Sequence, residues 1–552
     1  MDIGPPNQPK APQACVACRK QKRKCDKALP SCSLCSRMSR SCDYSESNPH
    51  PSADDFAMMR QKIADLEARL EGRRSDMFWN EPKRSIGKSP NTTNTDFGLA
   101  NDNRPTFPAA FFLDAEVFTD AHMTITKPAL AVPSEILATL GTSMLDIQDV
   151  VDRYFANIHT WLPFISKKRM ELTLCNPSIE LSLELALLLL AMKLIIQVPS
   201  GDSPGIRSPL YTLTKRHFSR AESVGLISLQ TLQASILIAA YEIGHAIYPA
   251  AYLTTGHCAR LGHALGLNDR RHAPQALKKK IGAWAEIEEM KRTWWATMLL
   301  DRHVNLGTCG HPLATDDPAR NDVLPADDAL WDGGEMTTSE PLYVSSPTSV
   351  KAGAFARTCQ ATHLLGRLIR LLNDRLLDAP LRFSEAIQLH RTLQALANLL
   401  PSDVQRWPMR YGTPLALCYS ALIHLCDPFT CTESNRGDHT VEETEMQAIA
   451  IAGLRSTAAD VLQLSHLFQM TITANPAAIS PLVADCFYSA AATYAWLVHE
   501  SGSREMAEAY HQLRKVLDIM SARWAVASQY LVILNKAQES FYPDTLLLQS
   551  PV

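Results

Sequence analysis

The chain has 552 residues, 46% of them hydrophobic, which is enough for about three or four average domains or for one large domain with appendages. Its net charge of −3 is unevenly distributed, because eight Lys and Arg residues between Cys15 and Cys42 face a single acid, Asp26, leaving about −10 for the rest of the chain. A basic block on an otherwise acidic chain indicates one polyanion-binding module and argues against a generally cationic surface.

Two features of the sequence argue against secretion and against a membrane span. The first thirteen residues, "MDIGPPNQPKAPQ", contain no apolar stretch of the kind found in a signal peptide. The strongest apolar run, Leu181 to Ile196, contains Glu184 and Lys193 and is shorter than the ~20 residues that a bilayer span needs, so it predicts a buried helix. We expect a reducing intracellular compartment, where clustered cysteines are metal ligands more often than disulfides.

Six cysteines near the start form a duplicated pattern. The spacing C-x2-C-x6-C occurs twice, with an offset of seventeen residues. Structural zinc takes four ligands, so six thiolates can serve two zinc ions only if two of them bridge both metals. The duplication suggests an equivalent bridging pair without saying which. The predicted metal ligands are Cys15, Cys18, Cys25, Cys32, Cys35 and Cys42.

A segment of some thirty residues has too little core to fold alone, so zinc binding of ~10–16 kcal/mol would supply its stability. Cys18 and Cys25 lie seven residues apart, two helical turns, and would face the same side of a helix. The intervening "RKQKRK" would then project away from the metal. A disulfide knot and a single-zinc protein-binding module are the alternatives, and neither explains this basic run.

These residues resemble the fungal binuclear zinc-cluster DNA-binding domain, and "CRKQKRKCDKALPSC" follows the pattern of that family. The resemblance implies that Cys15 and Cys32 bridge the metals. It also implies that Pro30 matches the loop proline of the family, whose peptide bond is often cis. One zinc would then be held by Cys15, Cys18, Cys25 and Cys32, and the other by Cys32, Cys35, Cys42 and Cys15.

The resemblance also implies how DNA would be read. In the family the end of the first helix enters the major groove and reads a CGG-type triplet, and lysine can donate to guanine O6 and N7. By position, Lys22 is the base-reading residue, while Arg19, Lys24 and Lys27 match phosphate contacts. Gln21 stands where a basic residue is usual. The alternatives for these charges are a solvated helix face and a nuclear-import signal.

A linker and a candidate dimer element follow the cysteines. The polar, proline-containing "SESNPHPSADD" predicts an unstructured strap. After it, apolar residues recur at alternating spacings of three and four, typical of a and d positions in a parallel coiled coil, although over barely two heptads. A lone amphipathic helix is the alternative. The predicted dimer residues are Phe56, Met59, Ile63, Leu66 and Leu70.

The rest of the chain, from about 137 to 539, has helical periodicity almost throughout. In "EIEEMKRTWWATMLLDRHVNL", Ile287, Met290, Trp294 and Met298 share one stripe. No alternating runs are long enough to predict a sheet. The eight cysteines after the cluster lack paired spacing and are expected to be reduced core residues.

This region resembles the middle homology region of fungal transcription factors. The resemblance rests on "YFANIHTWLPFIS", "GHCARLGHALGLNDR", "KRTWWATMLLDRHVNLGTCGHP" and "LIHLCDPF", and covers roughly 150–430. His311 stands where the family usually has arginine. The acidic stretch 314–334 is expected to be a structural loop, with an activation segment as the alternative. His257 and His263 could suggest a metal site, but six residues apart on a helix they would diverge.

The interpretation is a mainly α protein: a small binuclear zinc-cluster domain with two Zn²⁺, a short coiled coil, and a large all-α regulatory domain, with disordered linkers. The expected function is a nuclear, sequence-specific regulator that binds CGG-type double-stranded DNA as a homodimer, contacts the transcription machinery and acts on a metabolic, including secondary-metabolite, gene cluster. The alternatives are a zinc-cluster module or corepressor that binds protein, and an α-helical enzyme with a fused zinc module. No catalytic motif such as G-x-S-x-G or H-E-x-x-H is present, so no enzyme is expected. The expected segments are a disordered N-terminus (1–14), the zinc-cluster domain (15–44), a linker (45–55), the short coiled coil (56–71), a mostly disordered linker (72–136), the all-α regulatory domain (137–539) and a C-terminal tail (540–552).

Overall fold

The structure is a computed structural model of the chain. Contacts divide the chain into two compact units, Met1–Asp102 and Asn103–Val552, each with its own core. The predicted coiled coil, the linker before it and residues 72–129 of the linker after it lie outside the described residues. The structure describes residues 10–11, 13–20, 24–38, 40–44, 130–141, 143–176, 181–198, 207–268, 283–307, 310–336, 340–347, 349–374, 376–430 and 440–541.

The first unit has two short helices, α1 (Val16–Lys20) and α2 (Ser33–Arg37). Each has five residues, too few for a helix to be stable by itself in water. Both pack on a small core made of cysteine side chains. The local structure therefore depends on whatever holds those cysteines together.

The second unit is mainly helical in its described parts. The prediction of a mainly α protein is confirmed, since the only extended pairings in the described ranges are isolated bridges, Lys10 with Ala28 and Val323 with Tyr343. The helices are α6 (Ser134–Leu140), α7 (Met144–Asn157), α8 (Lys167–Leu174), α9 (Leu183–Ile195), α10 (Pro209–Ser223), α11 (Leu229–Gly244), α12 (Ala250–Ala264), α13 (Trp284–Val304), α14 (Asp328–Gly333), α15 (Ala354–Asn373), α16 (Ala379–Ala397), α17 (Pro401–Arg406), α18 (Pro408–Cys426), α19 (Val441–Ala474), α20 (Ala484–Ser501), α21 (Arg504–Ser521) and α22 (Ala525–Phe541).

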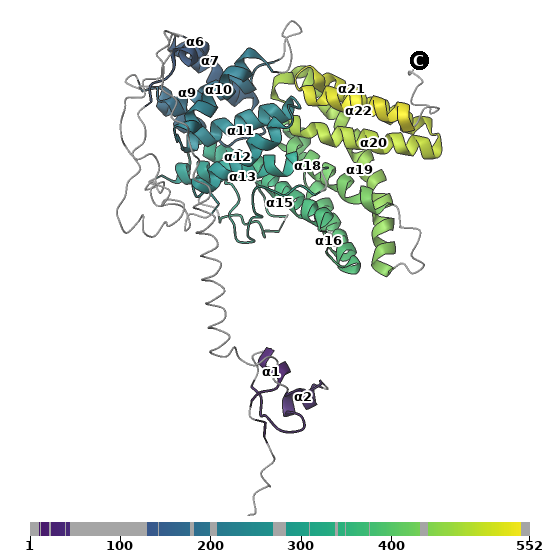
Figure 1. The fold of residues 1–552 in the computed structure, drawn as a ribbon. Coiled ribbons are helices and arrows are strands. Elements are labelled where there is room, and N and C mark those ends of the chain that lie inside the picture. The colour runs from purple at the N-terminus through teal and green to yellow at the C-terminus, as the bar shows by residue number, and fades with distance from the viewer. Residues whose placement is uncertain are drawn as a thin grey trace, which may run out of the picture. The chain divides into compact units, whose positions relative to one another are not determined.

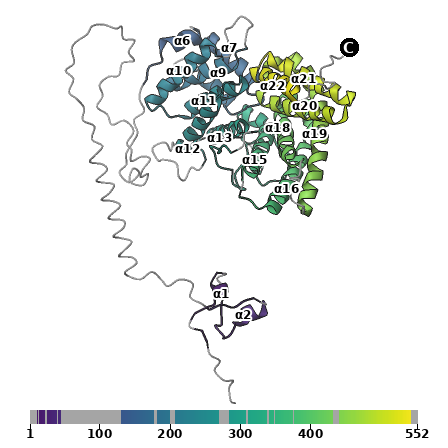
Figure 2. The ribbon, with the colours of Figure 1, turned by 45° about the vertical axis from the view of Figure 1, so that its right-hand side comes forward.

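These helices form three groups along the chain (Figures 1 and 2). The first group contains α9, α11, α12 and α13, which contact one another. The second contains α15, α16, α18 and α19, and the third contains α20, α21 and α22. Helix α18 contacts members of the second and third groups, and one continuous hydrophobic core runs through all three.

Helix α9 explains the strongest apolar run of the sequence. The Ser182 side chain accepts a hydrogen bond from the Leu185 N–H, which caps the helix at the start of the run. Nearly every residue of α9 is buried, so the prediction of a buried helix is confirmed. Among the helices that the described residues form, none is both long and apolar enough to cross a membrane.

Buried charges on α13 hold its neighbours in place. Arg292 is fully buried, and its guanidinium donates to the carboxylates of Glu288 at 3.0 Å and Asp328 at 2.8 Å. It also lies 4.1 Å from the centroid of the Trp331 ring. A buried guanidinium is tolerated when its donors are all used in this way. Arg292 therefore fixes α14 against α13.

Asp301, near the end of α13, holds the loop that follows. Its carboxylate accepts hydrogen bonds from the N–H groups of Ala314 at 3.1 Å and Thr315 at 3.0 Å. Arg302 donates to Asp301 at 2.6 Å. The Asp301 carboxylate thus attaches the backbone of the loop after residue 310 to α13. This loop contains the start of the acidic stretch 314–334. Apart from α14, that stretch has the loop structure expected for it.

The described cysteines of this unit are reduced. Five of them, Cys258, Cys359, Cys418, Cys426 and Cys486, are buried as predicted. The prediction is wrong for Cys175, which is exposed because it follows the last turn of α8 and faces away from the core. Cys309 and Cys431 lie outside the described residues.

Candidate metal centre and nucleic-acid interface

Four cysteines from the two halves of the duplication meet in the core of the first unit. Cys15, Cys18, Cys32 and Cys35 are all at most 3% exposed. Their sulfur atoms all lie within 4.8 Å of one another, and none of the four forms a disulfide. Buried, reduced thiols this close together are the donor set that tetrahedral zinc prefers. The residues present fit a zinc centre.

Two of these sulfurs make every short contact between the halves. Cys15 Sγ lies 3.8 Å from Cys32 Sγ and 3.7 Å from Cys35 Sγ. Cys32 Sγ also lies 3.8 Å from Cys18 Sγ. Each short contact therefore includes Cys15 or Cys32, the equivalent first cysteines of the two repeats. These two sulfurs occupy the junction between the halves.

The third cysteine of each repeat lies at the edge of the cluster and is half-buried. The Cys32 N–H donates a 3.2 Å hydrogen bond to the sulfur of Cys42. Burial opposes ionisation of Cys25, but N–H groups of Cys15 and Lys27 outweigh burial and lower the pKa of Cys25 to about 7. Backbone donors thus stabilise the thiolate form of these outer cysteines.

The inner thiols behave differently. Contact with the Cys15 sulfur, together with burial, raises the pKa of the Cys18 thiol. Contact with the Cys32 sulfur, together with burial, raises the pKa of the Cys35 thiol to about 12. Crowded thiols resist losing several protons because neighbouring thiolates repel one another. Zinc ions would supply the positive charge that allows all of them to ionise.

The loop between the repeats is held by its own hydrogen bonds. Asp26 accepts the Ser33 N–H at 3.2 Å and the Ser33 hydroxyl, which lowers the pKa of the Asp26 carboxyl. Lys27 has a φ of 62°, a left-handed conformation that turns the chain back. The peptide bond before Pro30 is cis, as the family resemblance implied.

Two backbone contacts close the unit. The Val16 N–H donates to the Asp43 carbonyl at 2.8 Å, and the Ala11 N–H donates to the Lys27 carbonyl at 2.8 Å. The Tyr44 hydroxyl donates to the Ala28 carbonyl at 2.8 Å. The contacts of this unit thus include Ala11, which lies before the domain boundary predicted at residue 15. The role of Tyr44 was not predicted, although a tyrosine two residues after the last cysteine is plain in the sequence.

The predicted DNA contacts are only partly described. Lys24 is exposed and Lys27 is half-buried, both close to Cys25 in the chain. The Arg19 side chain and Lys22 lie outside the described residues, as do all five predicted dimer residues. The second repeat adds basic side chains that the sequence analysis did not single out, the exposed Arg37 and Arg40. The seventeen-residue offset could have found them, because it maps Lys20 and Arg23 onto these arginines.

His257 and His263 do not come together in a metal site. His257 pairs with the Glu222 carboxylate, whereas the His263 ring lies 5.2 Å from the Trp294 ring, edge to face. Each histidine has its own neighbour on a different side of α12, as helical spacing predicted. His311 is exposed, with its ring 5.6 Å from that of Tyr252.

Two family comparisons match what the geometry indicates. Residues 13–51 match the fungal Zn(2)-Cys(6) binuclear cluster domain, and residues 151–409 match the fungal specific transcription factor domain. The chain belongs to the fungal Zn(2)-Cys(6) transcription factors. Both predicted resemblances, to the zinc-cluster domain and to the middle homology region, are confirmed. The family is one of transcription factors and not of enzymes. Its zinc-cluster domain binds DNA and holds two Zn²⁺ ions.

Relatives support this assignment. Transcription factor BOA15 of Botryotinia fuckeliana is 40% identical over 185 residues, which are 33% of this chain and 98% of that protein. The depudecin biosynthesis cluster-specific transcription activator DEP6 of Fusarium langsethiae is 23% identical over 54% of this chain and 57% of its own length. Sorbicillinoid biosynthetic cluster transcription factor 1 of Penicillium rubens is 24% identical over 64% of each chain. The matches to DEP6 and to the sorbicillinoid factor therefore span less than two thirds of those proteins.

Proposed function

We propose that this zinc-cluster transcription factor acts in the nucleus on RNA polymerase II genes and reads CGG-type triplets in double-stranded DNA. The observation that carries the proposal is the attachment of α1 to the cysteine cluster. Buried Cys18 lies on α1, and the basic run 19–24 follows it directly. A helix end anchored on a metal centre and followed by basic residues suits insertion into a major groove.

The cysteine contacts support a particular division of the zinc ligands. Cys15 and Cys32 bridge the two ions, since they make the short contacts between the repeats. Bridging thiolates must lie close to ligands of both metals, whereas the edge cysteines Cys25 and Cys42 serve one ion each. The proposed sets are Cys15, Cys18, Cys25 and Cys32 for one ion, and Cys32, Cys35, Cys42 and Cys15 for the other.

Basic residues would divide between reading bases and holding phosphates. We assign Lys22 to guanine and Arg19, Lys24 and Lys27 to phosphate oxygens, which fix the register without reading sequence. The exposure of Lys24 supports this role, because a phosphate contact needs an accessible ammonium group. We also propose the domain limits expected from the sequence, which are 15–44 for the zinc cluster, 56–71 for the coiled coil and 137–539 for the helical regulatory domain.

A homodimer and a biosynthetic gene cluster complete the proposal. One cluster reads only about three base pairs, so a second reading head is needed to select a site in a genome. The apolar seam from Phe56 to Leu70 is the candidate dimer element, and the transcription machinery is the expected partner of the bound dimer. The relatives named for depudecin and sorbicillinoid biosynthesis support regulation of a secondary-metabolite gene cluster.

The test is binding of the full-length, zinc-loaded protein to labelled duplexes, measured by fluorescence anisotropy. A duplex with two CGG triplets should bind roughly 10³-fold more tightly than a scrambled duplex. Affinity should fall steeply as salt rises, because phosphate contacts release counterions. Equal affinity for both duplexes would favour the alternative of a protein-binding zinc module.

Pathway specificity has a separate test. Chromatin immunoprecipitation of the tagged protein should enrich promoters of one contiguous biosynthetic gene cluster. Deleting the gene should change the transcript levels of the same cluster. Enrichment scattered over unrelated promoters would contradict a cluster-specific role and leave the DNA-binding proposal intact.

A further inference from the structure

The apolar stripe of α13 that the sequence singled out is only partly covered by neighbouring helices. Ile287 is 44% exposed, and Met290 and Trp294 are half-buried. Only Met298, further along the stripe, is 2% exposed. Apolar residues with helical spacing are usually covered by a neighbouring helix. Here part of the face stays open within the described structure.

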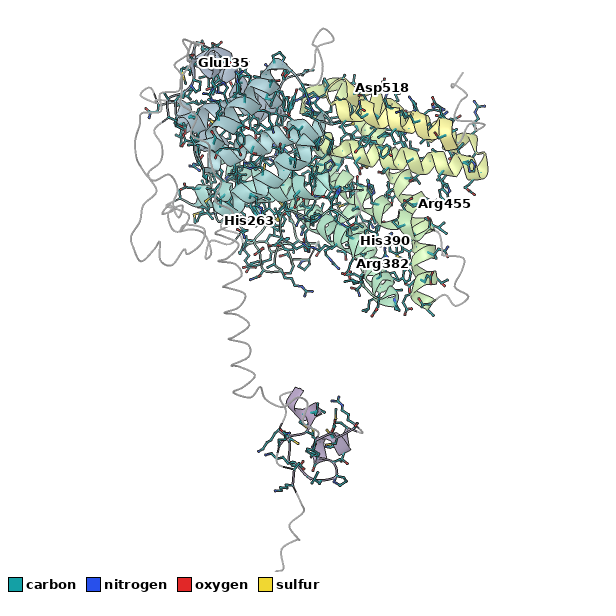
Figure 3. The ribbon with its side chains drawn as sticks, viewed as in Figure 1. Glu135, His263, Arg382, His390, Arg455 and Asp518 are labelled. Atoms are coloured by element: carbon teal, nitrogen blue, oxygen red, sulfur yellow. The ribbon has the colours of Figure 1, made fainter. Side chains whose placement is uncertain are left out.

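The open part of the stripe forms one wall of a pocket of about 200 Å³. Leu267 and Asn268, just after α12, form a second wall. Pro318, Asp322 and Val323, from the loop that Asp301 holds against α13, form the third. In Figure 3 the region is found near the labelled His263, at the end of α12. Three separately anchored segments therefore shape the pocket.

The position of Trp294 is built into the fold. A Cβ atom on Gly262 would lie 2.6 Å from Cζ3 of Trp294, so the ring occupies space that only glycine leaves open. The His263 ring packs edge to face against the same indole at 5.2 Å. Two sides of the Trp294 ring are thus fixed by α12. The indole is held in place beside the pocket, which reduces the entropy lost when a ligand packs against it.

The lining chemistry selects a class of ligand. Trp294 and Trp295 offer aromatic rings, and Met290 and Met298 offer polarizable sulfurs that favour aromatic neighbours. An engineered apolar cavity of about 150 Å³ is known to hold benzene, so about 200 Å³ suits one or two rings. Lys291 lies at the pocket too. Its ammonium is 2.7 Å from the Glu288 carboxylate, and its side chain is 25% exposed.

We propose that this pocket, bounded by α12, α13 and the loop 318–323, binds a one- or two-ring aromatic small molecule with a polar substituent directed toward Lys291. The proposal goes beyond DNA recognition and is independent of it. The flat ring system packs against the indole of Trp294 and the sulfur of Met290, the two of these side chains that are only half-buried. The polar substituent accepts a hydrogen bond from the lysine ammonium, which has donors left over from its contact with Glu288.

The probe is 2-naphthol, titrated into the full-length, zinc-loaded protein and followed by calorimetry and saturation-transfer NMR. Saturable binding with a dissociation constant on the order of 0.1 mM is expected for a ligand of this size. Fully saturated decahydro-2-naphthol, with the same heavy atoms but no ring face, should bind about tenfold more weakly. Equal binding of the two compounds, or no saturable binding of 2-naphthol, would overturn the proposal.

A matched pair of variants locates the site. Ile287→Trp at the pocket should weaken 2-naphthol binding at least about tenfold by filling the space. Ile533→Trp on α22, where the isoleucine is 45% exposed, should leave the affinity unchanged. If Ile287→Trp alters the fold, as judged by circular dichroism, Val323→Trp blocks the pocket from the opposite wall. Unchanged affinity in a folded pocket variant would place the binding elsewhere and refute the assignment.

Discussion

The guanidinium of Arg523 donates a 2.9 Å hydrogen bond to the carbonyl oxygen of Gln197, 326 positions earlier in the chain. It also donates to the carbonyl of Ile195, the last residue of α9, and lies 3.8 Å from the centroid of the Trp524 ring. A buried cation at the carboxyl end of a helix meets the negative end of the helix dipole. Arg523 therefore ties the turn between α21 and α22 to α9.

Replacing this side chain should destabilise the helical unit. Arg523→Met removes charged donors from two buried carbonyl groups, and we expect a loss of about 2–4 kcal/mol in the free energy of unfolding. Urea unfolding of the full-length protein, followed by circular dichroism, measures it. Arg504→Met is the control, because the Arg504 side chain is 86% exposed and its pair with Glu508 should contribute less than about 0.5 kcal/mol. Similar losses in the two variants would contradict this role for Arg523.

Zinc stoichiometry tests the bridging assignment. Native mass spectrometry should show two zinc ions per wild-type chain, both lost on chelation. Cys32→Ser should lose both ions, because a shared thiolate leaves each metal short of ligands, whereas Cys42→Ser should retain one. Cys258→Ser, which alters a buried cysteine of the helical unit, is the control and should keep two. Retention of two zincs in Cys32→Ser would show that Cys32 does not bridge.

Base reading and phosphate binding should separate in affinity measurements. Lys22→Ala should cost about 1–3 kcal/mol on a CGG duplex and little on a random duplex, since it removes a base contact. Lys24→Ala should weaken both complexes alike and lower the salt dependence by about one phosphate contact. Fluorescence anisotropy at two salt concentrations gives both quantities. Equal losses on the two duplexes for Lys22→Ala would make it a phosphate contact.

Dimerisation should depend on the predicted seam. Ile63→Asp combined with Leu66→Asp places charges at two apolar positions and should abolish dimeric binding to a duplex with two half-sites. Analytical ultracentrifugation of the complex measures its stoichiometry. Both zinc ions should remain, because the cysteine cluster does not include these residues. Unchanged two-site binding would mean that the protein binds as a monomer or dimerises through its helical domain.

A partly buried histidine–aspartate pair should make the helical unit sensitive to pH. His424 Nε2 lies 3.3 Å from the Asp485 carboxylate. Burial alone would lower the pKa of His424, but the Asp485 carboxylate outweighs burial and raises the pKa of His424 above 6.5. For Asp485 the balance is reversed: burial alone would raise its pKa, but His424 outweighs burial and lowers the pKa of Asp485. The stabilisation is therefore complete below pH 6.5, is lost as pH rises through the raised pKa of His424, and is lost at acid pH as Asp485 protonates.

The variant His424→Gln should show that pH dependence. It should lower the free energy of unfolding by about 1–3 kcal/mol at about pH 6, with a smaller loss at about pH 8.5. Neighbouring His303 acts in the opposite sense, because burial lowers its pKa and its protonation below pH 6.5 destabilises the fold. Comparing variant with wild type at each pH removes only the part of the His303 contribution that does not depend on the charge of His424. A loss that grows from pH 6 to pH 8.5 would contradict the pairing.

The zinc cluster could be predicted from the sequence because its information is local. Metal-ligand spacing within twenty-eight residues specifies the donor set, and the cis bond before Pro30 followed from the same resemblance. Helix α9 was equally accessible, since its apolar run and the Ser182 cap are contiguous. In each case the residues that interact are near neighbours in the chain.

Contacts between distant residues could not be predicted in this way. His424 and Asp485 lie 61 positions apart, and no periodicity links Arg523 to Gln197. The stripe on α13 was recognised, but its pattern could not reveal that Ile287 borders a pocket instead of a neighbouring helix. Helical spacing of apolar residues shows that one face of a helix is apolar, but it does not show which part of the protein covers that face.

The hydrogen bond from the Val16 N–H to the Asp43 carbonyl has a consequence for protein engineering. It holds the two ends of the cysteine-rich unit within a single hydrogen bond of each other. An insert with adjacent ends can replace the tip of a surface loop without forcing the host strands or helices apart. The segment around residues 15–44 should therefore serve as a transplantable cassette, carrying its zinc-dependent fold into an unrelated host and making the folding of that host loop conditional on metal.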